Sequence, residues 1–300
     1  MSDAERIFTQ HARSFAPATR LLPRADRERI ARLYAICRTL DDLADRDGSR
    51  AAAQRLARIE AELRGTTVVT DPLVVEADKL FAGDSQSRAT LADLTARVLQ
   101  DTTGVQIKDD TELLDYAWHV AGTVGLLFCD LYGIRAAEAR ARAASLGIAM
   151  QLTNIVRDVG EDARAGRRYL PATWLPASPA ELVDASPAGR AEVRAAIHRT
   201  LALAERHYSH GLSGLPVLPL RVRVTVMVAA ALYRAIGRQL GGRGDLALDR
   251  RVHVPLGTKV VVACRALISL FRPAGAVTAE YPHAGSRPGH INSRRRLRRP

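Results

Sequence analysis

The chain is poor in cysteine, methionine and aromatic residues. Of its 300 residues, only three are cysteines, three are methionines and 5% are aromatic. Cys37, Cys129 and Cys264 lie far apart inside apolar patterns, so they form neither a CxxC metal motif nor an even set of disulfides. We expect three core thiols in a reducing compartment.

Long hydrophobic runs are also missing. The N-terminal sequence MSDAERIFTQ has no apolar signal segment. The longest apolar stretches fall short of the roughly 18 residues that suggest a membrane-spanning helix. These absences predict a cytoplasmic protein, which can still touch a membrane at its periphery.

Acidic residues are absent from the C-terminal end. The chain has a net charge of +12, and the sequence after Glu280 contains six arginines and no acid among several Pro, Gly and Ser residues. This composition predicts a folded domain over residues 1–280 and a disordered basic tail over residues 281–300. A basic tail can attract anionic lipid headgroups or RNA. We expect no nucleic-acid partner and keep membrane contact as the open alternative.

Helical patterns dominate what is present. With 47% hydrophobic residues the chain can bury a substantial core. Apolar residues recur at helical spacing, no alternating strand pattern stands out, and the abundant Ala, Leu and Arg favour helices. We therefore predict a single-domain, all-α fold. Helices are expected from Ala25 to Gly48 and over residues 50–64, 72–82, 86–101, 110–132, 136–164, 188–210, 219–240 and 255–271.

The segment RTLDDLAD places two aspartates on one helix face. Asp41 and Asp45 are spaced i, i+4, which stacks them one turn apart. Arg38 and Tyr34 fall within about 60° of the same line, at about 100° per residue. Asp42 is rotated further away. Apolar residues on the far side would seat this face against the core.

A second acidic face lies about 115 residues later, in QLTNIVRDVGED. Asp158 and Asp162 are again spaced i, i+4, with Asn154 and Gln151 one and two turns earlier and Glu161 alongside. The repetition of one arrangement on two helices is the informative feature of the sequence.

Two acidic faces inside an apolar bundle require a cation between them, because uncompensated carboxylates there would be strongly unfavourable. Carboxylates without His or Cys partners suit Mg²⁺, which shares its shell with substrate phosphates. The pair of motifs therefore indicates a diphosphate clamp, with Arg38 and Arg157 in contact with phosphate oxygens. The alternative is a pair of solvated helix ends held by i, i+4 salt bridges, which the presence of both motifs disfavours.

Four stretches resemble signatures of the squalene/phytoene synthase family, and of its bacterial phytoene synthases in particular. They are HARSFAPATRLLP, YAICRTLDDLAD, YAWHVAGTVG and QLTNIVRDVGEDARAGRRYLP. The resemblance implies an isoprenoid synthase-type helical bundle with a central active-site cavity. It also implies that two geranylgeranyl diphosphate molecules join head to head, through a cyclopropylcarbinyl diphosphate, to give phytoene.

The resemblance further implies roles for individual residues. The expected metal ligands are Asp41, Asp45, Asn154, Asp158 and Asp162. Tyr34 and Tyr233 join these aspartates as catalytic residues. The implied substrate-binding residues are Ser14, Arg38, Tyr116, Gln151, Asn154, Arg157 and Arg251. The expected cofactor is Mg²⁺, with Mn²⁺ as the alternative ion, and no NADPH is expected for phytoene formation.

Several questions stay open at the level of sequence. A squalene or dehydrosqualene synthase that uses farnesyl diphosphate would carry the same motifs, and a helical scaffold without catalysis is the alternative from another class. Gly122 and Gly125 predict either close helix packing or a kink beside the substrate. Residues 166–189 contain four prolines and predict a long loop. In that loop Arg167, Arg168 and Tyr169 could close over diphosphate as a flap, or the basic residues could simply follow a helix end.

Overall fold

The computed structural model describes Arg6, Phe8, Thr19 and residues 22–44, 49–242 and 244–269. The predictions for Ser14, Asp45 and the tail over residues 281–300 lie outside this part of the chain.

The described residues form a bundle of helices, which confirms the all-α prediction. Apart from one isolated bridge between Gln106 and Arg168, they contain no β-structure. The elements are α2 (Arg24–Asp42), α3 (Arg50–Leu63), α4 (Pro72–Phe81), α5 (Ser85–Asp101), α6 (Asp110–Ala117), η3 (Trp118–Gly122), α7 (Thr123–Leu131), α8 (Ala137–Arg157), α9 (Val159–Arg164), α10 (Pro179–Val183), α11 (Pro187–Leu212), η4 (Leu215–Val217), α12 (Leu220–Gly242), α13 (Leu246–Asp249) and α14 (Leu256–Ser269).

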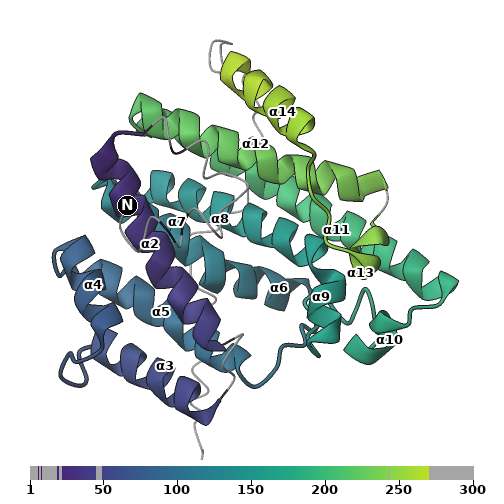
Figure 1. Cartoon of the computed structure of the whole chain (residues 1–300), viewed down its shortest axis with the longest axis horizontal. Coiled ribbons are helices and arrows are strands. Elements are labelled where there is room, and N and C mark those ends of the chain that lie inside the picture. The colour runs from purple at the N-terminus through teal and green to yellow at the C-terminus, as the bar shows by residue number, and fades with distance from the viewer. Residues whose placement is uncertain are drawn as a thin grey trace, which may run out of the picture.

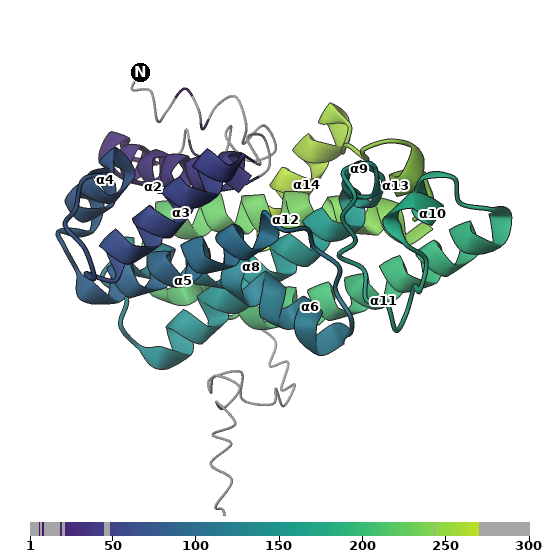
Figure 2. The same ribbon diagram turned by 90° about the horizontal axis from the view of Figure 1, so that it is seen from below.

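Helix α8 lies inside the bundle. It packs against α7 on one side and against α11 and α12 on the other, as both views show (Figures 1 and 2). Apolar residues recur along it at helical spacing, and Leu152, Ile155 and Val156 are buried. A separate apolar cluster holds α2 to α5 and α7 together around Leu40, Leu56 and other buried side chains. Because α8 is packed between these helices, its polar C-terminal end is held at a defined place in the bundle.

Two predicted helices are interrupted. The helix expected over 110–132 contains the π-helical turn η3, and the helix expected over 136–164 breaks at Asp158, whose φ of −105° and ψ of 11° lie outside the helical range. The break has a packing reason. A Cβ at Gly160 would lie 2.3 Å from the Leu248 carbonyl oxygen, so α9 approaches the backbone of α13 as only glycine allows.

Glycines also let η3 and α7 approach α8. A Cβ at Gly147 would lie 2.1 Å from the Ala121 carbonyl oxygen, and one at Gly125 would lie 2.3 Å from that of Ala143. Close packing is therefore the correct interpretation of Gly125. At Gly122 the nearest atoms belong to the Trp118 side chain, 3.2 Å away, and the residue ends the π-helical turn.

The predicted loop over residues 166–189 contains the short helix α10, which begins with a capping box between Ser178 and Glu181. Arg168 is buried in this segment and donates hydrogen bonds to the carbonyl oxygens of Ala177, at 2.9 Å, and Pro176, at 3.4 Å. Its backbone pairs with residues Val105 and Ile107. The guanidinium therefore ties the loop to itself, and the role of Arg168 in closing over diphosphate stays a prediction.

One of the three expected core thiols is not in the core. Cys129 is buried and Cys37 is half-buried, but Cys264 is exposed. It lies on the outward side of α14, which packs on α12 through one face only. Within the described residues, no helix combines the length and the hydrophobicity needed to cross a bilayer.

The contact between α8 and η3 can be tested through Gly147. Replacing Gly147 by Ala should lower the free energy of unfolding by about 1–3 kcal/mol, because the new methyl group forces the two backbones apart. Gly241 near the end of α12 is the matched control, since a Cβ there meets nothing within 4 Å. Gly241→Ala should leave the stability unchanged or raise it. Thermal unfolding followed by circular dichroism measures both. Equal stability of the two variants would contradict the close contact.

Candidate active site

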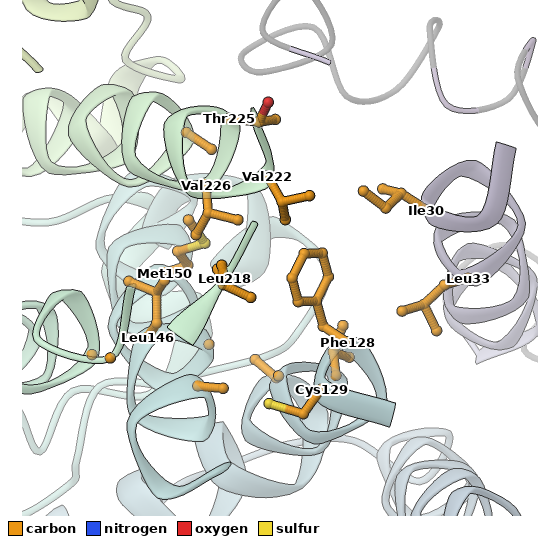
Figure 3. A pocket seen from close by; sticks show the side chains of 18 of the residues that line it. Ile30, Leu33, Phe128, Cys129, Leu146, Met150, Leu218, Val222, Thr225 and Val226 are labelled. Atoms are coloured by element: carbon orange, nitrogen blue, oxygen red, sulfur yellow. The ribbon is translucent and has the colours of Figure 1, made fainter. Parts of the chain in front are cut away.

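A cavity of about 310 Å³ lies in the middle of the bundle. Figure 3 shows apolar side chains from α2, α7, α8 and α12, and from the turn after η4, pointing into it. The labelled lining residues are Ile30, Leu33, Phe128, Cys129, Leu146, Met150, Leu218, Val222, Thr225 and Val226. A concave space with so few polar groups in its wall suits a long apolar chain.

Three of the predicted site residues line this cavity, and they bring polar groups to it. They are Tyr34 on α2 and Gln151 and Asn154 on α8. The Asn154 Nδ2 donates to Gln151 Oε1 at 3.3 Å, while Asn154 Oδ1 is buried without a hydrogen-bond partner among the described residues. A buried acceptor without a partner is unfavourable. Its place beside the cavity indicates that a ligand or ion completes the site.

The α2 face is organised by an ion pair. Arg38 donates to Asp42 Oδ1 at 2.5 Å, and Asp41 beside them is exposed. Burial opposes the charged guanidinium, but the pair with Asp42 outweighs it and raises the pKa of Arg38 above its usual value. Sequence reasoning placed Asp42 away from the Asp41–Asp45 line and did not consider it as the i, i+4 partner of Arg38.

The Tyr34 hydroxyl stays protonated over the physiological range. Burial is the main cause that raises the pKa of Tyr34 to about 12, and the neighbouring Tyr233, Asp41 and Asp42 add to it against the opposing effect of Arg38. The Tyr34 ring also packs edge-on against Phe8, with centroids 5.2 Å apart. Tyr34 is thus a fixed hydrogen-bond donor close to Tyr233 of α12.

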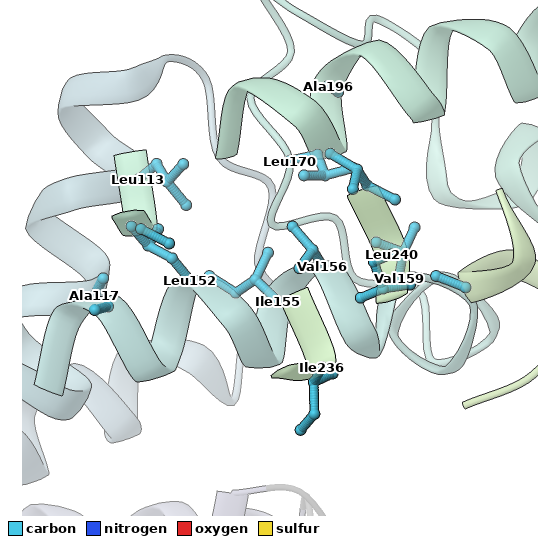
Figure 4. Packing of buried hydrophobic residues seen from close by; sticks show 14 of the residues in the cluster. Leu113, Ala117, Leu152, Ile155, Val156, Val159, Leu170, Ala196, Ile236 and Leu240 are labelled. Carbon is cyan, nitrogen blue, oxygen red and sulfur yellow. The ribbon is translucent and has the colours of Figure 1, made fainter. Parts of the chain in front are cut away.

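The second face is formed where α8 ends. The apolar residues Leu152, Ile155, Val156 and Val159 anchor this part of the chain in the core (Figure 4). Beyond them Arg157 binds the Asp158 carboxylate through two bonds, Nε to Oδ1 at 2.8 Å and Nη2 to Oδ2 at 2.5 Å. The pKa of Arg157 is raised, because Asp158 and the hydrogen-bonded Tyr233 outweigh the effect of burial.

Arg251, from the segment between α13 and α14, reaches the same carboxylate. Its Nε lies 3.1 Å from Asp158 Oδ1, and its Nη1 lies 3.5 Å from Glu161 Oε2. Two arginines therefore compensate Asp158 from different parts of the chain. Both are cations that a diphosphate could attract.

Tyr116 and Tyr169 form a second aromatic pair near the acidic residues. Their ring centroids are 4.9 Å apart. Burial raises the pKa of Tyr116 well above its usual value, and Tyr169, Asp101 and Asp41 raise it further. Burial likewise raises the pKa of Tyr169, with an added effect of Asp162. The charges of Asp41 on α2 and Asp162 on α9 thus both affect this pair of tilted tyrosine rings.

Two further residues of this region were missed by sequence reasoning. The Arg97 guanidinium lies over the Tyr116 ring, 4.8 Å from its centroid, and its Nε lies 3.3 Å from Asp101 Oδ1. In the sequence they form an ordinary i, i+4 pair on α5, which carries no signal of a site. Tyr169 was considered only as part of a flap.

The donor set fits Mg²⁺ in its chemistry. Asp41, Asp158, Asp162 and the unpartnered Asn154 Oδ1 offer hard oxygen ligands and no sulfur or imidazole. Among the described residues, which exclude Asp45, no three His, Cys, Asp or Glu side chains are close enough together to hold a metal ion. Asp158 is engaged by Arg157 and Arg251, and Asp162 lies 3.8 Å from the Arg167 guanidinium.

Comparisons with known proteins agree with this architecture. A family model described as squalene/phytoene synthase matches residues 8–258. A phytoene synthase of Cereibacter sphaeroides is 36% identical, covering 90% of this chain and 81% of that protein. A 15-cis-phytoene synthase of Enterobacter agglomerans is 35% identical, covering 80% of this chain and 85% of that protein.

A solved structure shares both fold and sequence. It is that of a dehydrosqualene synthase in complex with a ligand, with a TM-score of 0.76 and 27% identity over 89% of this chain and 95% of that one. The family model spans most of the sequence, and the relatives share more than a third of the aligned residues. The chain therefore belongs to the squalene/phytoene synthase family.

Proposed function

We propose that the protein joins two geranylgeranyl diphosphate molecules head to head and forms phytoene with release of diphosphate. The observation that carries the proposal is an apolar cavity lined by Gln151 and Asn154 of α8, one turn before the Arg157–Asp158 pair at the end of that helix. Relatives that cover most of the chain are named phytoene synthases, which supports this product. The cavity would hold the prenyl chains, and the charged mouth would hold their diphosphates.

Arg157, Arg251 and Arg38 are the proposed diphosphate ligands. Each is held by a carboxylate, the first two by Asp158 and the third by Asp42. A diphosphate carries more charge than one carboxylate and would draw these guanidinium groups towards it. Asp158 would then be available as a metal ligand.

Mg²⁺, or Mn²⁺ in its place, would be held by Asp41, Asp45, Asn154, Asp158 and Asp162. When bound, the ion neutralises the charge that develops on the departing diphosphate. Tyr34 and Tyr233 would donate hydrogen bonds near that group, and the apolar wall would keep water away from the allylic cation. Released diphosphate can accept the proton that the product loses, so no separate base and no NADPH are required.

We also propose that the protein works in the cytoplasm and releases its product at a membrane surface. Phytoene is a hydrocarbon of forty carbons, and transfer into water costs about 0.8 kcal/mol for each CH₂, or roughly 30 kcal/mol in all. A bilayer removes that cost. A second candidate product is dehydrosqualene, because the solved dehydrosqualene synthase is 27% identical.

The substrate can be identified directly. Purified protein given geranylgeranyl diphosphate and Mg²⁺ in detergent should form phytoene, and addition of NADPH should not change the product. Removal of the metal with EDTA should abolish turnover, and added Mg²⁺ should restore it. The hydrocarbons are identified by chromatography with mass detection. A product formed only from farnesyl diphosphate would favour the second candidate, and no turnover of either substrate by folded protein would refute both.

Asp158→Asn tests the charged mouth. The variant should lower kcat on the order of 10²-fold, since the amide cannot serve as an anionic ligand for the metal. Asp249→Asn is the matched control, because Asp249 pairs with Arg190 on the exposed surface. It should keep the wild-type rate. Thermal unfolding of both variants confirms folding, and a wild-type rate in Asp158→Asn would show that the carboxylate does not take part.

A further inference from the structure

Helix α14 exposes its apolar side. It packs on α12 through Val262, Ala263 and Ala266. At about 100° per residue, six apolar residues occupy the neighbouring sector of about 140°, which α12 leaves uncovered. We call these residues the α14 face: Leu256, Val260, Val261, Cys264, Leu267 and Ile268.

The exposure of the α14 face is unusual for this chain. Leu256 is 78% exposed and Ile268 is 61% exposed. Of the ten large hydrophobic side chains exposed among the described residues, five belong to this one helix. Scattered exposed apolar residues need no explanation, but a contiguous set marks an interaction surface.

The charge on α14 and in the sequence that follows it is almost entirely positive. The helix itself contains Lys259 and Arg265 and no acid. From Leu256 to the end of the sequence there are nine lysines and arginines against the single acid Glu280. A partner that covers the α14 face therefore meets apolar groups and an excess of positive charge together.

A groove runs between α12 and α14 beside this face (Figure 1 shows the two helices side by side). It has a volume of about 750 Å³, and Arg234, Arg238 and Arg265 line it together with apolar side chains. Leu215 of η4 lines both the groove and the central cavity. One side chain thus connects the space proposed for the prenyl chains with the surface that carries α14.

We propose that the α14 face is a docking surface for an anionic lipid bilayer, with the apolar residues in the acyl boundary and Lys259, Arg238 and Arg265 at the headgroups. The inference rests on the proposed function, whose hydrocarbon product needs an apolar destination. Basic residues near the surface of an anionic membrane attract it, and apolar side chains gain by burial in it.

The charges favour a bilayer over other occupants. A second copy of the chain would bring the same positive groups together without an acidic counterpart on α14. RNA would satisfy the arginines but would leave the apolar residues of the α14 face uncovered. An anionic bilayer offers both kinds of contact in one surface.

Sedimentation with lipid vesicles tests the surface without substrate. The full chain should bind vesicles of phosphatidylcholine with phosphatidylglycerol and should bind pure phosphatidylcholine about tenfold less tightly, with binding reduced by added salt. The double variant V260D/I268D should lose about tenfold or more in affinity. V68D/V183D is the matched control, because Val68 and Val183 are also exposed apolar residues and lie outside α14. It should bind like the wild type.

Phytoene formation in detergent separates this proposal from the proposed function. V260D/I268D should keep the wild-type kcat in detergent micelles, since neither residue lines the central cavity. If the wild type bound vesicles but formed no phytoene, the proposed function would be overturned and the proposed lipid-binding surface would stand. Equal vesicle binding by wild type and V260D/I268D would overturn the surface. The proposal would also be overturned if V260D/I268D lost only self-association. The same holds if the variant lost only RNA binding and the wild type did not bind vesicles.

Discussion

Charge compensation at the end of α8 is the constraint on which the site depends. The Arg157 side chain is 11% exposed and that of Asp158 18%, so neither can rely on water alone. Arg251 completes the compensation from the segment after α13. The same region is held by Arg164, which donates to the Leu248 carbonyl oxygen at 2.6 Å. A distant part of the chain is therefore fixed to the active region by the need to balance one carboxylate.

Helix α8 also carries both the apolar and the polar surroundings that a prenyl diphosphate requires. Leu146 and Met150 of the same helix face the cavity, and Asn154 and Arg157 follow at the next turns. Polar and apolar parts of one substrate can thus be held by one rigid element. A helix places side chains more reproducibly than a loop does, whereas Arg251 and Tyr169 reach this region from outside regular helices.

Sequence periodicity located most helices to within a few residues, because burial of one face repeats every three to four positions. It could not predict the break at Asp158, which depends on the approach of Gly160 to Leu248 about 90 residues away. The i, i+4 pair of Arg38 and Asp42 was readable from the same spacing, but attention to the Asp41–Asp45 face left it out. Sequence periodicity could not place Tyr169 either. Its loop is positioned by the hydrogen bonds of Arg168 with backbone atoms, which a sequence pattern does not show.

Helix α14 is more exposed than its apolar sequence predicts. Apolar residues occupy most of its circumference, interrupted by Lys259 and Arg265, and a helix of this kind is normally buried on most sides. Here α12 covers one face only, so Cys264 and its neighbours remain in contact with solvent. The free energy lost by this exposure is recovered only if something apolar covers the face, while the basic residues around it keep the uncovered chain from associating with itself. The same positive charge that prevents self-association selects an anionic partner.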